Sequence, residues 1–358
     1  MCLFGDLHVG RPYYHCVLCH QGYFPWDEEL GLGKRSLTPA VSELSALAGT
    51  LASFAFGAER TLLKMTGLRI SESTVERVTE EAGARVGTLL EQRVTFGADR
   101  LWKWQRDALG RTCAYVSLDA KSVRMQGLKG ARAEGRMAYV ASIYNPDSEH
   151  DGRKKDPHQV RFLACFYELD ELGLHLRRQA AQVGWDEAQQ QIAISDGGNG
   201  MERFLRRNFP LAEIIIDFWH VKEHLLEFAK AQFPQEEERQ TWMDRQSHLL
   251  KHAGGAAVLK QLQAIEPCSA PETRELHRAT VQYFVNHQHK MDYPRYVAQG
   301  WQIGSGPIES ACRTVVGDRL GGSGMRWGTD GANGMCHLRA LFRSEPDQWE
   351  NFWRSHRN

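Results

Sequence analysis

Three acidic residues that lie far apart in the chain have the surroundings expected of metal ligands. Asp119 follows the apolar run "AYVSL", Asp196 follows "QIAIS", and Glu309 follows "GSGPI". The first two runs are typical of buried strands, and each is predicted to end at its aspartate. Because the carboxyl ends of neighbouring strands in an open α/β sheet border one crevice, we expect Asp119 and Asp196 to meet there. Two adjacent carboxylates repel each other, which predicts a hard divalent cation bound through oxygen.

Glu309 is the predicted third ligand, and it is expected on a helix. Pro307 suits the first helical position, so Glu309 falls in the first turn, where the helix dipole favours a carboxylate. Capping alone would explain this glutamate, just as turn formation alone would explain the two aspartates. The lead-in of Gly304, Ser305 and Gly306 favours a ligand role, because it lets a backbone or phosphate approach closely.

Together, two strand-end aspartates and a helix-borne glutamate are the ligand set of a two-ion centre for phosphodiester chemistry. In such centres one ion activates the attacking oxygen and the other stabilises the leaving oxygen, about 3.5–4 Å away. We therefore predict two Mg²⁺ or Mn²⁺ ions at Asp119, Asp196 and Glu309.

The elements that must position these acids follow from the hydrophobic pattern after residue 112. Three consecutive strands and then alternating helices and strands predict an α/β fold with a mixed sheet. Helical periodicity dominates 220–300, and a last helix at 307–320 carries Glu309. The predicted order in the sheet region is a strand within 112–123 that ends at Asp119, strands at 136–145 and 159–169, a helix at 170–185, a strand at 191–196, a helix at 198–209 and a strand at 212–220.

The first 36 residues carry one C-x-x-C pair, Cys16 and Cys19, flanked by His15 and His20. A structural zinc site needs four ligands, usually from two such pairs. We therefore interpret residues 1–36 as part of a zinc-ribbon-like segment that is entered midway. There are two alternatives. The flanking histidines complete a Zn²⁺ site here, or the remaining ligands lie in sequence that precedes this start.

Residues 37–92 are predicted to be helical. A helix break at Gly67, followed by a helix capped by Ser71 or Ser73, gives this region the helix and turn lengths of a helix-turn-helix, which suggests DNA binding. A plain helical hairpin used for packing or dimerisation is the alternative.

Composition is that of an ordinary soluble globular chain of 358 residues, with 44 basic and 44 acidic residues. Residues 93–136 carry ten basic and only four acidic side chains, which could neutralise DNA phosphates or form a solvated face. Eight scattered cysteines are typical of a reducing compartment, and no apolar stretch is long enough to cross a bilayer. We expect a cytoplasmic, nucleoid-associated protein.

A second motif offers a different chemistry. His220, Glu223 and His224 form H-x-x-E-H, the inverted zinc-peptidase signature. Both histidines would share one helical face, with Glu223 as general base. His220 directly follows the run "EIIIDFW", however, so the helix would have to begin abruptly there.

Three long blocks resemble bacterial insertion-sequence DDE transposases, most closely the ISKra-type group, which is related to the Mutator-like transposases. The resemblance extends from "RPYYHCVLCHQGYFPWDEELGLG" to the C-terminus. The blocks are "YVSLDAKSV", "ISDGGNGMERFLRRNFPLAEIIIDFWHVKEHL" and "GWQIGSGPIESACRTVVGDRLGGSGMRWGTDGANGMCHLRAL".

This resemblance implies an RNase H-like catalytic core with Asp119, Asp196 and Glu309 as its triad. It also implies that Asp217 and His220 form the accessory D-x-x-H signature. The core would comprise 93–218 and 301–358, interrupted by a helical insertion at 219–300. Candidate DNA-binding residues are Arg203, Arg206, Arg207, Arg313, Arg326 and Trp327, the last of which could stack on frayed bases or simply be packed.

The resulting prediction is a transposase that cleaves and joins DNA through a 3′-OH. Its partners would be the terminal inverted repeats of its element and target DNA, and a homodimer or larger assembly would hold two ends together. Sequences of this family begin earlier and include a first cysteine pair that this chain lacks. A truncated transposase that binds DNA without cutting it is therefore the alternative.

Overall fold

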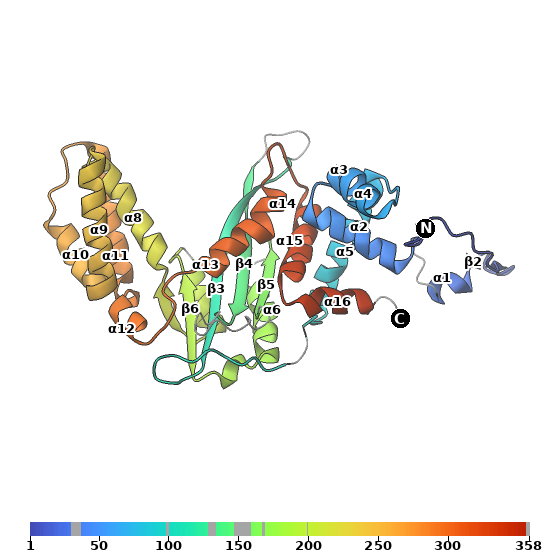
Figure 1. Cartoon of the computed structure of the whole chain (residues 1–358), viewed down its shortest axis with the longest axis horizontal. Coiled ribbons are helices and arrows are strands. Elements are labelled where there is room, and N and C mark those ends of the chain that lie inside the picture. Colours follow the sequence, from blue (N-terminus) through green and yellow to red (C-terminus); the bar gives the residue numbers. More distant parts are fainter. Residues whose placement is uncertain are drawn as a thin grey trace.

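A five-stranded mixed sheet forms the centre of the protein (Figure 1). Its strand order is β5-β4-β3-β6-β7, in which β3, β4 and β5 are antiparallel neighbours and β6 and β7 run parallel to β3. The predicted α/β class with a mixed sheet is therefore confirmed. The strands are β3 (Cys113–Arg124), β4 (Gly135–Tyr144), β5 (Val160–Cys165), β6 (Gln190–Ser195) and β7 (Glu213–Ile216). This computed structural model describes residues 1–29, 37–97, 100–127, 134–146, 159–166, 169–198 and 200–355.

Three strand limits differ from those predicted. The third strand does not reach residue 169, because β5 ends at Cys165 and a helix, α6, begins at Leu169. The first strand does not end at Asp119 but continues to Arg124, because β4 pairs with it along this whole length. The last strand does not reach residue 220. It ends at Ile216, and helix α8 begins at Phe218, because Asp217 caps that helix.

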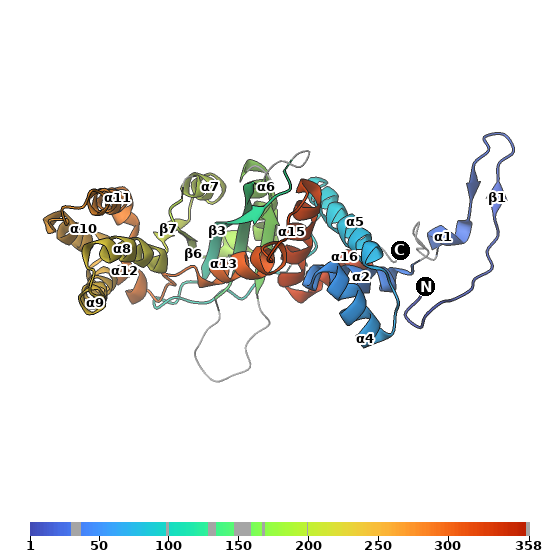
Figure 2. The same cartoon turned by 90° about the horizontal axis from the view of Figure 1, so that it is seen from above.

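The two faces of the sheet carry different helices, as Figure 2 shows. Helices α6 (Leu169–Gln182) and α7 (Met201–Asn208) cover one face, where Val116 and Leu118 contribute to the core. Helix α13 (Gly306–Ala311) and the π-helical turn η5 (Cys312–Gly317) cover the other face, where Tyr115 of β3 contributes to the core. Since side chains alternate along a strand, Asp119 points to the same face as Tyr115, towards α13.

Between β7 and α13 every regular element is a helix, in agreement with the helical periodicity of 219–300. These helices lie at one end of the sheet in Figure 1, and their core is continuous with the core on the α13 face of the sheet. Phe228 and Phe284 are fully buried within it. The elements are α8 (Phe218–Gln232), α9 (Glu236–Ala253), α10 (Gly255–Ala264), α11 (Pro271–His287), η4 (Gln288–Lys290) and α12 (Tyr293–Ala298).

The helices of 37–92 pack at the opposite end of the sheet. Gly67 adopts a left-handed conformation with φ of 75°, and Ser71 caps α5 by accepting a hydrogen bond from the Thr74 amide. Helix α5 crosses α15 (Thr329–Arg343) so closely that a Cβ on Gly83 would lie 2.5 Å from the Gly334 carbonyl oxygen. One face of α5 is thus fully used in packing. The other elements here are α2 (Pro39–Leu51), α3 (Phe54–Phe56), η1 (Gly57–Leu62), α4 (Leu63–Thr66), α5 (Glu72–Glu91), α14 (Asp318–Leu320) and α16 (Pro346–Arg354).

The N-terminal segment extends away from the sheet (Figures 1 and 2). It contains the short strands β1 (Tyr14–His15) and β2 (Gly22–Tyr23) and helix α1 (Pro25–Glu29). Residues 30–36 of the predicted zinc-ribbon-like segment lie outside the described residues. Across the described part of the chain, no helix combines the length and apolar character required to cross a membrane.

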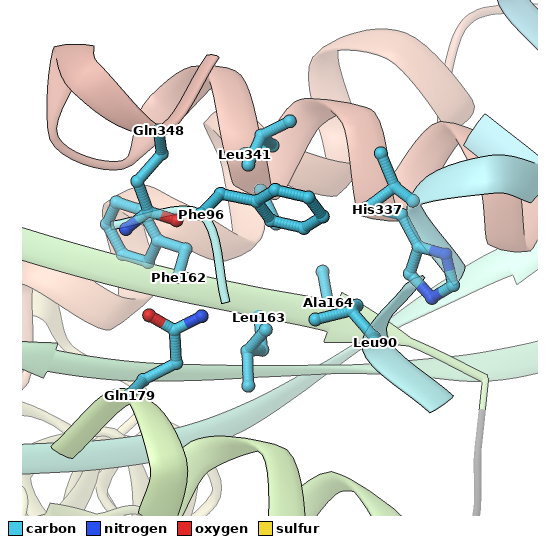
Figure 3. Close-up of a pocket in the computed structure, with 11 residues that line it drawn as sticks. Leu90, Phe96, Phe162, Leu163, Ala164, Gln179, His337, Leu341 and Gln348 are labelled. Atoms are coloured by element: carbon cyan, nitrogen blue, oxygen red, sulfur yellow. The ribbon is translucent and has the colours of Figure 1, made fainter. Parts of the chain in front are cut away.

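A small void lies inside the core between β5, α5, α6 and α15 (Figure 3). Its space of about 10 Å³ would hold one water at most. Its walls are mainly apolar, with Phe96, Leu163 and Leu341 among them. It is therefore a packing defect and not a ligand site.

Candidate functional site

A cavity of about 190 Å³ opens where β6 and β7 end, beside the middle of β3. Its lining includes all three predicted ligands, Asp119, Asp196 and Glu309. Two further acids, Asp217 and Glu223, also line it, so the cavity is strongly acidic. The other lining residues are Leu118, Ser195, Trp219, His220, Ser305 and Ile308.

The register of the sheet places Asp119 level with Asp196. Ser117 of β3 pairs with Ile194 of β6, and each aspartate lies two residues further along its strand. Both are half-buried and both point to the α13 face. The chain turns sharply after Asp196 because Gly197 has φ of +82°, and the Gly198 amide donates to Asp196 Oδ1 at 2.8 Å. Asp196 therefore takes part in the turn and also presents its carboxylate to the cavity.

The protonation of Asp119 reflects this crowding. Burial raises the pKa of its carboxyl group, and the neighbouring charge of Asp196 raises it further. The Ala120 amide and the Cys312 thiol partly offset this by hydrogen bonding to the carboxylate. Burial, together with the same contact, raises the pKa of Cys312, so the thiol remains protonated and donates to Asp119.

Asp217 joins the sheet to both helices that border the cavity. Its Oδ1 accepts hydrogen bonds from the amides of Trp219 and His220 at the start of α8, at 2.5 and 2.9 Å. Its Oδ2 accepts one from the Ser305 amide, just before α13. Because the Ser305 carbonyl accepts from the Glu309 amide at 3.0 Å, this buried carboxylate indirectly fixes Glu309. The D-x-x-H aspartate thus positions the backbone at the starts of α8 and α13.

Glu309 lies in the first turn of α13 and its side chain is exposed towards the cavity. The neighbouring Ile308 is 1% exposed and anchors the helix in the core. α13 also contacts β3, the strand that carries Asp119. The structure thus brings all three predicted acids to one cavity.

Two tyrosines of the helical insertion hold the strand ends that carry the acids. Tyr283 of α11 donates to the backbone carbonyl of Asp196 at 3.2 Å. Tyr293 of α12 donates to the carbonyl of Ile216 at 2.8 Å, directly before Asp217. The insertion is therefore attached to the site through backbone groups, which no sequence motif indicates.

The donor atoms of this cavity fit a hard divalent cation. They are carboxylate oxygens, and within the described ranges none of Asp119, Asp196 and Glu309 forms an ion pair with lysine or arginine. Over the same residues no three His, Cys, Asp or Glu side chains are arranged to hold a metal ion. Mg²⁺ does not need such a cage, since it commonly binds one or two carboxylates and keeps several waters.

The H-x-x-E-H residues lie near the same cavity but are arranged differently. Helix α8 does begin abruptly after β7, so the geometric objection to this motif does not hold. The rings of His220 and His224 are nearly perpendicular, with centroids 4.9 Å apart, and His224 packs against Tyr283 at 4.0 Å. His220 Nδ1 lies 3.3 Å from Glu223 Oε2. The histidines thus have partners other than a shared metal.

The predicted DNA-binding arginines fall into two groups. Arg203, Arg206 and Arg207 are on α7, on the face of the sheet opposite α13 (Figure 2). Arg206 pairs with Glu202 and Arg207 with Asp170. The structure does not bring these residues to the acidic cavity.

The second group lies on the α13 face. Arg313 and Lys121 flank Gly317, where an added Cβ would lie 4.0 and 3.9 Å from their side chains. Arg326 is exposed, and its carbonyl accepts from Gln126 at the end of β3. Of the basic stretch 93–136, Lys121 is therefore the residue next to the site, while Lys129 and Arg132 lie outside the described residues.

The stacking role expected of Trp327 does not fit its position. This side chain is 8% exposed and packs edge-on against Phe54, with ring centroids 6.3 Å apart. The buried Arg319 guanidinium lies 4.9 Å from its ring and donates to the Gly49 carbonyl at the end of α2. Trp327 is therefore a core residue, as the packing alternative predicts.

Cys16 and Cys19 lie in the exposed turn between β1 and β2. Backbone amides of Cys19 and Leu18 donate to the Cys16 sulfur and lower its pKa, which favours the thiolate that zinc requires. No third or fourth ligand joins them among the described residues. Zn²⁺ binding at Cys16 and Cys19 therefore stays a prediction.

Sequence reasoning missed three residues at the site: Cys312, Tyr283 and Trp219. The contact of Cys312 with Asp119 depends on how η5 packs on β3, which the sequence does not show. Trp219 lies within the D-x-x-H motif, yet nothing in the sequence distinguishes an exposed tryptophan from a buried one.

Compared with known proteins, the chain matches no protein-family model and gives no match among curated proteins.

Proposed function

We propose that this protein is a DNA transposase that acts by divalent-metal-dependent phosphoryl transfer. The observation that carries the proposal is that Asp119, Asp196 and Glu309, which are distant in sequence, line one cavity. The strand order supports an RNase H-like core, because three antiparallel strands are followed by two strands parallel to the first. The resemblance of the motif blocks to DDE transposases supplies the substrate class.

The chain's own residues have separable roles in this scheme. Asp119, Asp196 and Glu309 hold the cation-binding oxygens, and Asp217 keeps the two helix starts in place. When bound, divalent ions would activate the attacking oxygen and stabilise the leaving oxygen. Lys121 and Arg313, on the same face, would attract the DNA backbone.

Two phosphoryl transfers would take place at this one site. Water attacks a phosphodiester at the element's end, the bond to the 3′ oxygen breaks, and a 3′-OH remains. That 3′-OH then attacks a phosphodiester of target DNA and forms a new bond, while the target's own 3′ oxygen leaves. No covalent link between protein and DNA is needed. A dimer would hold two ends together.

The alternatives have weaker support. A protein that only binds DNA would not need three carboxylates without cationic partners in one cavity. For the zinc peptidase, α8 begins where the motif requires, but the ring of His224 packs against Tyr283.

A nicking assay on supercoiled plasmid DNA tests the proposal. We expect nicks with Mg²⁺ or Mn²⁺ but not with EDTA. Asp196→Asn should cut at least about a hundredfold more slowly, because metal-ion stabilisation supplies several kcal/mol. DNA binding in a gel-shift assay should persist.

The matched control is Asp186→Asn. Asp186 is an exposed aspartate that precedes β6, at the opposite end of that strand from Asp196. It should cut like the wild type. Equal cutting by Asp196→Asn and the wild type would show that the cavity takes no part in the reaction. DNA binding by the wild type without cutting would support the non-enzymatic alternative.

A further inference from the structure

Trp219 is the most exposed tryptophan of the protein, and it lies at the carboxylate cavity. Its side chain is 57% exposed, whereas eight of the ten tryptophans are at least partly buried in the core. It lines the same cavity as Asp196 and Glu309. A large apolar surface in water is unfavourable, so this position needs an explanation other than packing.

The indole is held in place from several sides. Phe218 packs edge-on against it at 5.5 Å, with an interplanar angle of 83°. The backbone at Gly304 lies against it, since an added Cβ there would be 2.9 Å from Trp219 Cδ1. The Lys222 ammonium lies 4.7 Å from the ring centroid. The ring is therefore preorganised although much of it is open.

We propose that Trp219 is a stacking platform for an unpaired nucleobase next to the phosphate that reacts at the carboxylates. This inference deepens the proposed function and rests on it. A rigid aromatic face binds any base by stacking, at about 1–3 kcal/mol per base. Bases in a duplex have both faces covered by their neighbours, so only a frayed or extruded base has a face to offer.

The charges around the ring fit this occupant. The acidic cavity repels a bare phosphate, whereas Lys222 next to the indole would attract the phosphate that follows the stacked base. Trp219 also contacts Asp217 through its amide, which fixes the platform relative to the strand ends. The base-stacking residue of this site is thus Trp219 and not the buried Trp327.

The test measures binding of a fluorescein-labelled oligothymidine strand by fluorescence anisotropy, with Ca²⁺ present so that no cutting interferes. Trp219→Ala should weaken binding about tenfold, and Trp219→Phe should retain most of the affinity. An oligonucleotide of abasic units should bind the wild type and Trp219→Ala equally. Trp26→Ala is the matched control, since Trp26 is 42% exposed and lies in the N-terminal segment, and it should bind like the wild type.

Equal affinities of wild type and Trp219→Ala for oligothymidine would overturn the inference. So would equal losses on the oligothymidine and abasic strands, which would indicate a general effect on the fold or charge. If the wild type nicks plasmid DNA while Trp219→Ala binds normally, the proposed function stands without the platform. If Trp219→Ala loses base-dependent binding while the wild type never nicks, the platform stands and the catalytic proposal fails.

Discussion

Asp119 and Asp196 lie level with each other at the point where β6 ends and β3 continues. Both carboxylates point to the same face of the sheet, and the charge of Asp196 adds to burial in raising the pKa of Asp119. A protein that needed only turns at these positions would gain nothing from placing two acids together. The repulsion is a cost to the fold that a bound cation would remove, and it has consequences that can be measured.

Replacing Asp119 by asparagine should stabilise the metal-free protein at neutral pH. Burial and Asp196 raise the folded-state pKa of Asp119, so the folded protein binds its proton more tightly than the unfolded chain does. Stability therefore falls as pH rises through this range, and the wild type is penalised at pH 7. The asparagine side chain carries no charge, and its oxygen can still accept from the Ala120 amide.

We expect a gain on the order of 1 kcal/mol, or about 2 °C in Tm, measured by thermal denaturation in EDTA. The difference should be complete above the raised pKa of Asp119 and vanish below the usual aspartate range. A variant that is less stable than the wild type at pH 7 would contradict the burial and repulsion assigned to this carboxylate.

Mn²⁺ should raise the Tm of the wild type, and removing one tyrosine hydroxyl should reduce that shift. Tyr283 holds the backbone carbonyl of Asp196, so Tyr283→Phe leaves the carboxylate in place but less firmly oriented. A tenfold weaker affinity for Mn²⁺ would reduce the stabilisation at a saturating concentration by about 1.4 kcal/mol. Asp196→Asn should lose most of the shift.

Tyr139→Phe is the control for that measurement, because Tyr139 packs on the opposite face of the sheet. It should respond to Mn²⁺ like the wild type. If Tyr283→Phe lowered the Tm equally with and without Mn²⁺, the hydroxyl would contribute to stability alone.

Trp327→Ala should destabilise the fold without a specific effect on DNA. The buried ring contacts Phe54 and Arg319, and its removal leaves a cavity between α3 and the end of β3. Truncating a buried tryptophan typically costs about 3–5 kcal/mol in the free energy of unfolding. Urea denaturation measures this loss, and anisotropy on the folded protein should give unchanged DNA affinity. A stable variant with weakened DNA binding would return Trp327 to the DNA interface.

The amino-acid sequence determines the local features of this protein. The run "QIAIS" followed by Asp-Gly-Gly predicts a buried strand and a turn at Asp196, and the structure has both. The helical character of 219–300 and the cap at Ser71 are likewise local, because they depend on periodicity and on side chains near their own backbone. The mixed sheet follows from the order of these elements.

Only the tertiary structure decides which residues meet. Asp119 is next to Asp196 because β3 pairs with β6, a strand more than seventy residues away in the chain, and the hydrophobic pattern of one strand does not say which strand lies beside it. Asp217 acts as a clamp because two helices begin at its carboxylate, and β3 passes Asp119 because β4 supports it. Likewise, the side chain of Trp219 is exposed and that of Trp327 is buried, although both tryptophans lie near glycines and basic residues. Burial depends on what the rest of the chain places over a side chain, and a short sequence window contains no record of that.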